Sequence, residues 1–77
     1  MLRFKIKEMI AKKEFEEGRR ITISEVAEGA GIHRMTLSKL INQKGYSTGT
    51  DNLDRLCRYF QCEVSDLVVY VGDNSPH

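Results

Sequence analysis

The stretch from Ile23 to Asn42 limits the possible folds of this chain more than any other part of the sequence. Apolar residues recur at helical spacing before and after Gly31, and most positions between them are polar. Glycine readily adopts the positive φ that a sharp turn between two helices requires. The pattern therefore predicts two short helices, over about 23–29 and about 33–41, joined by a tight turn.

The start of the first of these helices is the best-defined boundary in the chain. Thr22-Ile23-Ser24-Glu25 fits a capping box, in which the Thr22 hydroxyl and the Glu25 carboxylate each accept a hydrogen bond from the other residue's backbone amide. Ile21 and Val26 stand at the two positions of a hydrophobic staple. Both signals place the helix start just after Thr22.

Another helix is expected before this motif, over about residues 4–17, where Lys and Glu are frequent. Gly18 is expected to end it, because Gly readily takes the left-handed conformation just past a helix. Its apolar stripe is formed by Ile6, Met9, Ile10 and Phe15.

After the motif, residues 42–49 form a loop that contains two Gly and no apolar periodicity. A fourth helix follows over about 51–60, with Thr50 or Asp51 as its N-terminal cap. Its apolar stripe is formed by Leu53, Leu56, Cys57 and Phe60.

The sequence predicts the secondary structure of the last part of the chain less clearly. A fifth short helix is expected over about 65–70, but the run Val68-Val69-Tyr70-Val71 fits an extended edge equally well. Residues 72–77 are expected to form a frayed tail. A length of 77 residues suits one domain and not two. We therefore expect a single all-α domain over residues 1–77, a compact bundle of four to five helices.

Charge is distributed unevenly along the chain. Residues 1–49 carry ten Lys or Arg and six Asp or Glu, whereas residues 50–77 carry two and five. No acidic residue lies between Glu28 and Asp51. The cations of this acid-free window are Arg34, Lys39 and Lys44. Such an asymmetry suits a protein that offers one face to phosphates, although a chance gap in surface acids would look the same.

Several classes of protein are not expected. The sequence has no apolar run of the roughly 20 residues that span a bilayer, and the alternating start Met1–Lys5 is no secretory signal. Cys57 and Cys62 are then expected to be reduced, structural thiols in the cytoplasm, and they make a poor zinc site. His33 has no partner that would build a catalytic pair. We therefore expect no enzyme, no metal or other cofactor, no small-molecule ligand and no membrane partner.

The residues around Gly31 resemble those of the Cro and phage-repressor (XRE) family of helix-turn-helix proteins. The positions that match are Val26, Ala27, Ala30, Gly31, Ile32, Leu37 and Leu40. The later segment LDRLCRYFQCEVSDLV also looks like the family's later helices, so the resemblance covers about residues 4–71. It implies a lambda-repressor-like DNA-binding fold with its motif at about 22–42, and a small cytoplasmic, nucleoid-associated transcriptional regulator of prokaryotic or phage origin.

The resemblance also implies which side chains meet double-stranded DNA. Those expected to read base edges lie on the second helix of the motif and just before it: His33, Arg34, Met35, Ser38 and Lys39. Those expected to contact phosphates are Ser24, Thr36, Asn42 and Lys44. For Met35, partial burial in the core is an almost equal alternative. Arg19 and Arg20 fit phosphate contacts and solvated loop positions equally well.

Two residues depart from the family pattern. Ile23 stands where many members carry a Gln that anchors a phosphate, so that contact should be missing. His33 stands where Ser or Thr commonly caps the second helix of the motif, and His is a weaker cap. The departures affect the details of docking rather than the fold.

One such helix reads only a few base pairs, so we expect a repressor that acts as a homodimer on an inverted repeat. The expected dimer surface is the fifth helix with Val68–Val71. The alternative is a protein-interaction module, such as an antitoxin or an accessory subunit with the same fold. The acid-free window favours DNA over that alternative.

Overall fold

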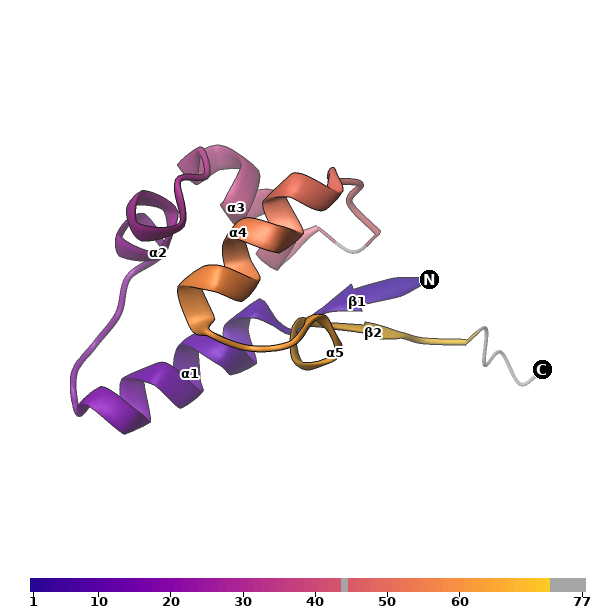
Figure 1. Ribbon diagram of the computed structural model, residues 1–77. Coiled ribbons are helices and arrows are strands. Elements are labelled where there is room, and N and C mark those ends of the chain that lie inside the picture. The colour runs from indigo at the N-terminus through magenta and orange to yellow at the C-terminus, as the bar shows by residue number, and fades with distance from the viewer. Residues whose placement is uncertain (44, 73–77) are drawn as a thin grey trace.

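The computed structural model of the chain describes residues 1–43 and 45–72, and within them five helices carry most of the structure (Figure 1). In chain order the elements are β1 (Leu2–Phe4), α1 (Ile6–Glu17), α2 (Ile23–Ala30), α3 (Arg34–Asn42), α4 (Thr50–Phe60), α5 (Val64–Leu67) and β2 (Val68–Tyr70). The expected helical class is confirmed, and so are the existence and order of the helices.

Every helix contributes at least one side chain to a single apolar core. The buried residues are Ile6, Ile21, Val26, Ala27, Ile32, Leu37, Leu40, Leu56 and Leu67. Burial of each large aliphatic side chain contributes roughly 1.5–3 kcal/mol to stability. The core therefore fixes α2 and α3 on the scaffold that α1, α4 and α5 provide.

Helix α1 departs from its sequence prediction at its start and in one residue of its apolar stripe. It begins at Ile6 rather than at about residue 4, because Phe4 belongs to β1 and the Lys5 amide donates to Leu67 O at 2.7 Å. Gly18 ends the helix with φ +65°, as predicted. Phe15 was expected on the apolar stripe, but its side chain is 89% exposed. The end of α1 that carries it lies at the edge of the molecule (Figure 1).

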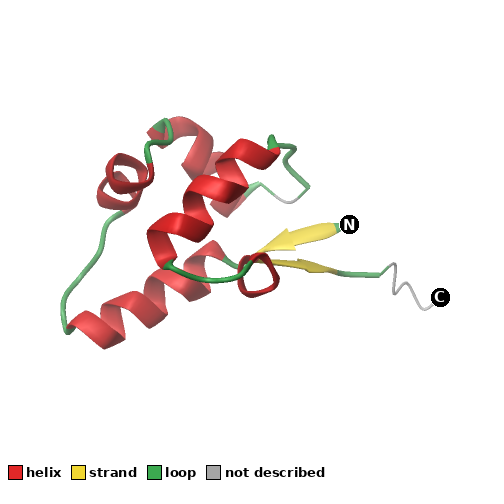
Figure 2. Cartoon of the chain, in the orientation of Figure 1, coloured by secondary structure: helices red, strands yellow, loops and turns green. Residues whose placement is uncertain are grey.

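A small sheet joins the two ends of the described chain, and the sequence analysis did not predict its first strand. Strands β1 and β2 pair antiparallel, with Leu2 opposite Tyr70 and Phe4 opposite Val68 (Figure 2). Of the two alternatives for residues 68–71, the extended one is correct. Helix α5 ends at Leu67 because Val68 is extended, with φ −132° and ψ 138°. The β-branched side chains of Val68 and Val69 suit the pleated conformation of a strand.

Helix α4 starts differently from the prediction. Its N-cap is Gly49, and neither Thr50 nor Asp51 makes a capping side-chain hydrogen bond to a described residue. Both belong to the first turn of the helix itself, where the negative charge of Asp51 interacts favourably with the positive end of the helix dipole. Ahead of the helix, Thr48 Oγ1 accepts a hydrogen bond from the side-chain amide (Nδ2) of Asn52 at 2.9 Å.

The close approach of α2 to α4 depends on Gly29. A Cβ atom at this position would lie 2.4 Å from Cε1 of Tyr59, well inside the contact distance of two carbon atoms. The Tyr59 ring is in turn packed edge-on against Phe60, with a centroid separation of 5.0 Å. The sequence suggested Ala27 as the small residue at a helix crossing, and Ala27 is indeed buried. The tightest contact nevertheless falls two residues later.

Candidate nucleic-acid interface

The turn between α2 and α3 has the geometry that its glycine predicts. Gly31 adopts φ +75°, and its amide donates to Ala27 O at 2.9 Å. The Ile32 amide bonds the same carbonyl oxygen at 2.9 Å, and the Ile32 side chain turns into the core. From α4, the Arg55 guanidinium donates to Gly31 O at 3.2 Å. This support for the turn was missed in the sequence, because no local pattern links positions 24 residues apart.

The predicted capping box at α2 forms only in part. Thr22 Oγ1 accepts from the Glu25 amide at 3.1 Å, as expected. The Glu25 carboxylate was expected to bond the Thr22 amide, but it accepts two hydrogen bonds from Arg19 instead. The Arg19 guanidinium offers the carboxylate two charge-assisted hydrogen bonds, whereas the Thr22 amide could offer one, so the carboxylate turns toward Arg19.

The face of α3 opposite the core gathers most of the predicted base-reading residues. Successive residues of an α-helix lie about 100° apart around its axis. Leu37 and Leu40 point into the core. Five residues lie within an arc of about 140° on the other side, namely Arg34, Met35, Ser38, Lys39 and Asn42. His33 immediately precedes the helix as its N-cap, at the same end as Arg34.

The exposure of these side chains decides the alternative left open for Met35. Met35 is 60% exposed, so it is not part of the core. Arg34 is also exposed and makes no ion pair with any described residue. Ser38 and Lys39 are half-buried. The most accessible groups are therefore at the N-terminal end of α3.

Internal contacts define which atoms of this face are available to a ligand. His33 Nδ1 accepts a hydrogen bond from the Met35 amide at 3.2 Å, so His33 does cap the helix. In that arrangement a neutral imidazole carries its hydrogen on Nε2, which can donate to an acceptor outside the protein. Asn42 donates to Ser38 Oγ at 3.3 Å, and the ammonium of Lys39 lies 5.8 Å from the centre of the Tyr46 ring.

The predicted phosphate-contacting residues are not all brought to one place. Asn42 lies on the exposed face of α3, whereas Thr36 is half-buried at the margin of that face. Ser24 is exposed in the first turn of α2. Lys44 lies outside the described residues. Ile23, which replaces the expected Gln anchor, is half-buried and packs against the core.

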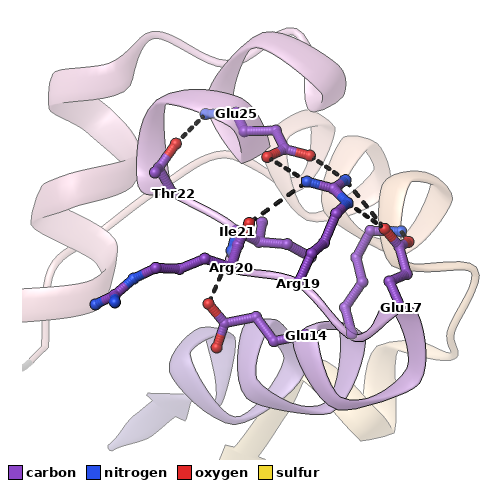
Figure 3. Close-up of polar contacts among 8 residues, drawn as sticks. Glu14, Glu17, Arg19, Arg20, Ile21, Thr22 and Glu25 are labelled. Carbon is purple, nitrogen blue, oxygen red and sulfur yellow. Dashed lines mark hydrogen bonds and ion pairs between the residues drawn. The ribbon is translucent and has the colours of Figure 1, made fainter.

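The connection from α1 to α2 distinguishes the two arginines that the sequence left equivalent. Figure 3 shows the Arg19 guanidinium between the carboxylates of Glu17 and Glu25, while the Arg20 side chain extends away from both. The Arg19 contacts measure 3.0 Å to Glu17 and 2.5 Å to Glu25. Arg19 is therefore occupied within the protein, and Arg20 keeps its charge available.

The cations around this connection lower the pKa values of the Glu17 and Glu25 carboxylates. Lys13, whose ammonium lies 2.8 Å from Glu17, and then Arg19 lower the pKa of Glu17. A hydrogen bond from Arg19 lowers the pKa of Glu25. A carboxylate whose pKa is lower in the folded state than in the unfolded state stabilises the fold at pH values above the unfolded pKa, which is ordinarily 4.5 for Glu. This stabilisation is lost as the pH falls through the folded-state pKa.

Arg19→Gln is expected to reduce the acid sensitivity of the protein, because it returns the pKa of Glu25 toward its ordinary value. Urea midpoints of wild type and variant at neutral pH and below the carboxylate pKa values measure this difference. The wild type should lose more stability on acidification, and high salt should shrink the gap because the cluster is exposed. Equal losses in both proteins would show that the cluster contributes nothing to folding.

Comparison with known proteins adds a family to this geometry. A family model described as a Cro/C1-type HTH DNA-binding domain matches residues 5–73 of the chain. The match covers all five described helices and not the α2–α3 pair alone. No curated protein and no solved structure matches the chain. Among the residues that the structure describes, no helix is long and apolar enough to cross a membrane.

Proposed function

We propose a specific role from one premise: this chain belongs to the family of Cro/C1-type helix-turn-helix DNA-binding domains, which bind DNA and regulate transcription. The proposed role is that of a repressor that binds double-stranded DNA sequence-specifically, as a homodimer on an inverted repeat. The observation that carries the proposal is the outer face of α3, which is exposed at Arg34 and Met35 and has no acidic residue; Arg34 has no ionic partner among the described residues. The whole chain, residues 1–77, acts as one domain in this proposal.

Recognition would proceed through α3 in the major groove, which admits one α-helix. Arg34 is the principal base reader, because a guanidinium can donate two hydrogen bonds to O6 and N7 of guanine. His33 Nε2 and the Ser38 hydroxyl supply further donors, and Met35 offers an apolar surface to a thymine methyl. The Lys39 ammonium becomes a further donor to the bases when it moves away from the Tyr46 ring.

Phosphate contacts would flank the reading helix. Ser24, Thr36, Asn42 and Lys44 are the residues that we assign to this role. Arg20 is a further candidate, because its side chain points away from the carboxylates that hold Arg19 (Figure 3). These contacts fix the position of the protein on the duplex and carry no sequence information directly.

The dependence of DNA binding on salt tests the premise of this mechanism. Each phosphate that the protein neutralises releases counterions and steepens the fall of log affinity against log salt by roughly 0.9. We expect a steep linear fall on a random duplex, and tighter binding to a duplex selected from a random library. A protein that binds neither duplex at low salt would instead be a protein-interaction module.

Dimerisation is supported by where the apolar surface lies. Large apolar side chains are exposed on the two strands, on α5 and at the residue before β1: Met1, Leu2, Val64, Val69 and Tyr70. The part of the sheet that the structure describes has only two strands, so β2 pairs on one edge alone. The free edge of such a strand readily pairs with another chain. In a two-fold symmetric dimer, β2 and α5 of one copy would pack against the same elements of the other copy and cover this surface.

Tyr70→Lys is expected to weaken the dimer at least about tenfold, or ~1.4 kcal/mol, because the two-fold axis brings the change into the interface twice. Tyr70 is 70% exposed in the single chain, so the substitution should not unfold it. Sedimentation equilibrium measures the dissociation constant. Phe15→Lys is the matched control, since Phe15 is a second exposed aromatic residue, on α1 and away from the sheet. Dissociation by Phe15→Lys alone would place the interface on α1.

Selection of binding sites from random duplexes tests the inverted repeat. The enriched sequence should be a palindrome with half-site centres about one helical turn, roughly 34–36 Å, apart. With Tyr70→Lys, the same selection should return a single half-site. A wild-type selection that also returns one half-site would contradict the homodimer.

A further inference from the structure

Cys57 lies in the last turns of α4, and Cys62 lies two residues past the end of that helix. Gln61 adopts the left-handed conformation with φ 54°, and its amide donates to Arg58 O at 3.3 Å. The Cys62 amide donates to Cys57 O at 3.1 Å. These two hydrogen bonds are those of a Schellman motif, in which Gln61 is the residue just past the helix.

A Schellman motif brings one particular pair of side chains together. They belong to the residues whose backbones share the outer hydrogen bond, and a hydrophobic contact between them usually accompanies the motif. In this chain both residues are cysteines. Burial and then the nearby Cys57 thiol raise the pKa of the Cys62 thiol, which agrees with two sulfur atoms that face each other.

One thiol of the pair, that of Cys62, lines a cleft that small molecules can enter. Both thiols are free and half-buried. Cys62 and Gln61 line a cleft of about 400 Å³ between α1 and the end of α4. Lys12 and Asp66 also line this cleft. The charge of Asp66 raises the pKa of the Cys62 thiol, and the charge of Lys12 lowers it. A reagent with a disulfide group can enter the cleft and meet Cys62 first.

We propose that Cys57 and Cys62 are a dithiol site that exchanges with low-molecular-weight disulfides to form a reversible bond across the end of α4. The Cys62 thiol loses its proton to solvent, and its sulfur attacks one sulfur of the small disulfide, releasing the other half as a thiolate. Deprotonated Cys57 then attacks the Cys62 sulfur of the mixed disulfide and releases the second half. The protein gives up two electrons and two protons, and the small disulfide is reduced to two thiols.

The geometry of the motif favours the internal bond over the mixed one. A disulfide requires backbones that lie close together, and the hydrogen bond between Cys62 N and Cys57 O holds them so. The bond closes a short loop around Gln61 and ties α4 to the segment that leads into α5. It leaves α3 untouched, so this site is independent of the DNA-reading face.

The test equilibrates the full-length protein in mixtures of reduced and oxidised glutathione, followed by alkylation and intact-mass measurement. We expect a monomeric product lighter than the dithiol form by two hydrogen atoms, at least tenfold more abundant than the glutathione adduct. Cys57→Ala and Cys62→Ala should each carry one glutathione and no internal bond. Glutathione adducts as the main wild-type product, or disulfide-linked dimers, would overturn the proposal.

A second pair of variants tests whether the motif holds the thiols together. Gln61→Gly keeps the left-handed conformation and should keep the yield of the internal disulfide, whereas Gln61→Val disfavours that conformation and should lower the yield severalfold. Circular dichroism confirms that both variants are folded. In the oxidised wild type, amide hydrogen exchange at Gln61 and Cys62 should slow severalfold. Equal yields from the two Gln61 variants would contradict the geometric basis of the site.

Discussion

Arg34→Ala is expected to lower affinity for the selected site roughly five- to 150-fold per recognition helix, or about 1–3 kcal/mol, and to flatten the preference at one base pair. The reason is that Arg34 is exposed at the start of α3 and has no ionic partner among the described residues. Affinity for a random duplex should fall much less. Fluorescence anisotropy on the selected site and on single-base variants of it measures both effects.

Arg58→Ala is the control for the loss of one positive charge. Arg58 lies on α4, is exposed, and pairs with Asp54 at 3.2 Å. Its replacement should leave the preference among sequences unchanged. If Arg34→Ala weakens all duplexes by the same factor, Arg34 contacts a phosphate and the base reader is another residue of α3.

Leu37→Ala is expected to destabilise the protein by about 2–5 kcal/mol, because Leu37 is fully buried at the centre of α3. For a domain of this size, such a loss lowers Tm by roughly 10 °C or more. Thermal unfolding followed by circular dichroism measures it. DNA binding should then fail at temperatures where the wild type still binds.

Met35→Ala, two residues earlier on the same helix, should behave in the opposite way. Met35 is 60% exposed, so its truncation should change the unfolding free energy by no more than about 0.5 kcal/mol. Any effect on DNA binding would then come from a lost contact and not from unfolding. A large loss of stability in Met35→Ala would mean that this side chain packs against the core in solution.

The features that could be predicted from the sequence are those that depend on local chemistry. The Thr22 cap, the helix end at Gly18 and the positive-φ turn at Gly31 each depend on residues within four or five positions, and the structure confirms all three. Apolar spacing identified Leu37 and Leu40 as buried for the same reason. Element boundaries differ from the predicted ones by one to three residues, most at the end of α5, where β2 begins directly after Leu67.

The features that could not be predicted depend on partners distant in the sequence. Strand β1 is a strand because Val68–Tyr70 pairs with it, and its alternating pattern is too short to indicate this alone. The loss of Glu25 from the capping box depends on where the α1–α2 connection places Arg19. The close contact of Gly29 with Tyr59 is also invisible before α2 and α4 are packed.

For the candidate site, the sequence and the family pattern supplied the residues, and the structure supplied their arrangement. It separates the exposed Arg34 and Met35 from the half-buried Ser38 and Thr36, which share the same polar stretch. It also assigns different roles to Arg19 and Arg20, which look alike in the sequence.

The pairing of β1 with β2 has a consequence for the order of folding. The backbone of Met1 bonds that of Val71, 70 positions later, whereas α2 and α3 are joined by contacts between near neighbours. Contacts between neighbours form faster than contacts that close a long loop. The contacts between α2 and α3 can therefore form before β1 pairs with β2. The surface proposed for dimerisation is completed last, after the helix that is proposed to read DNA.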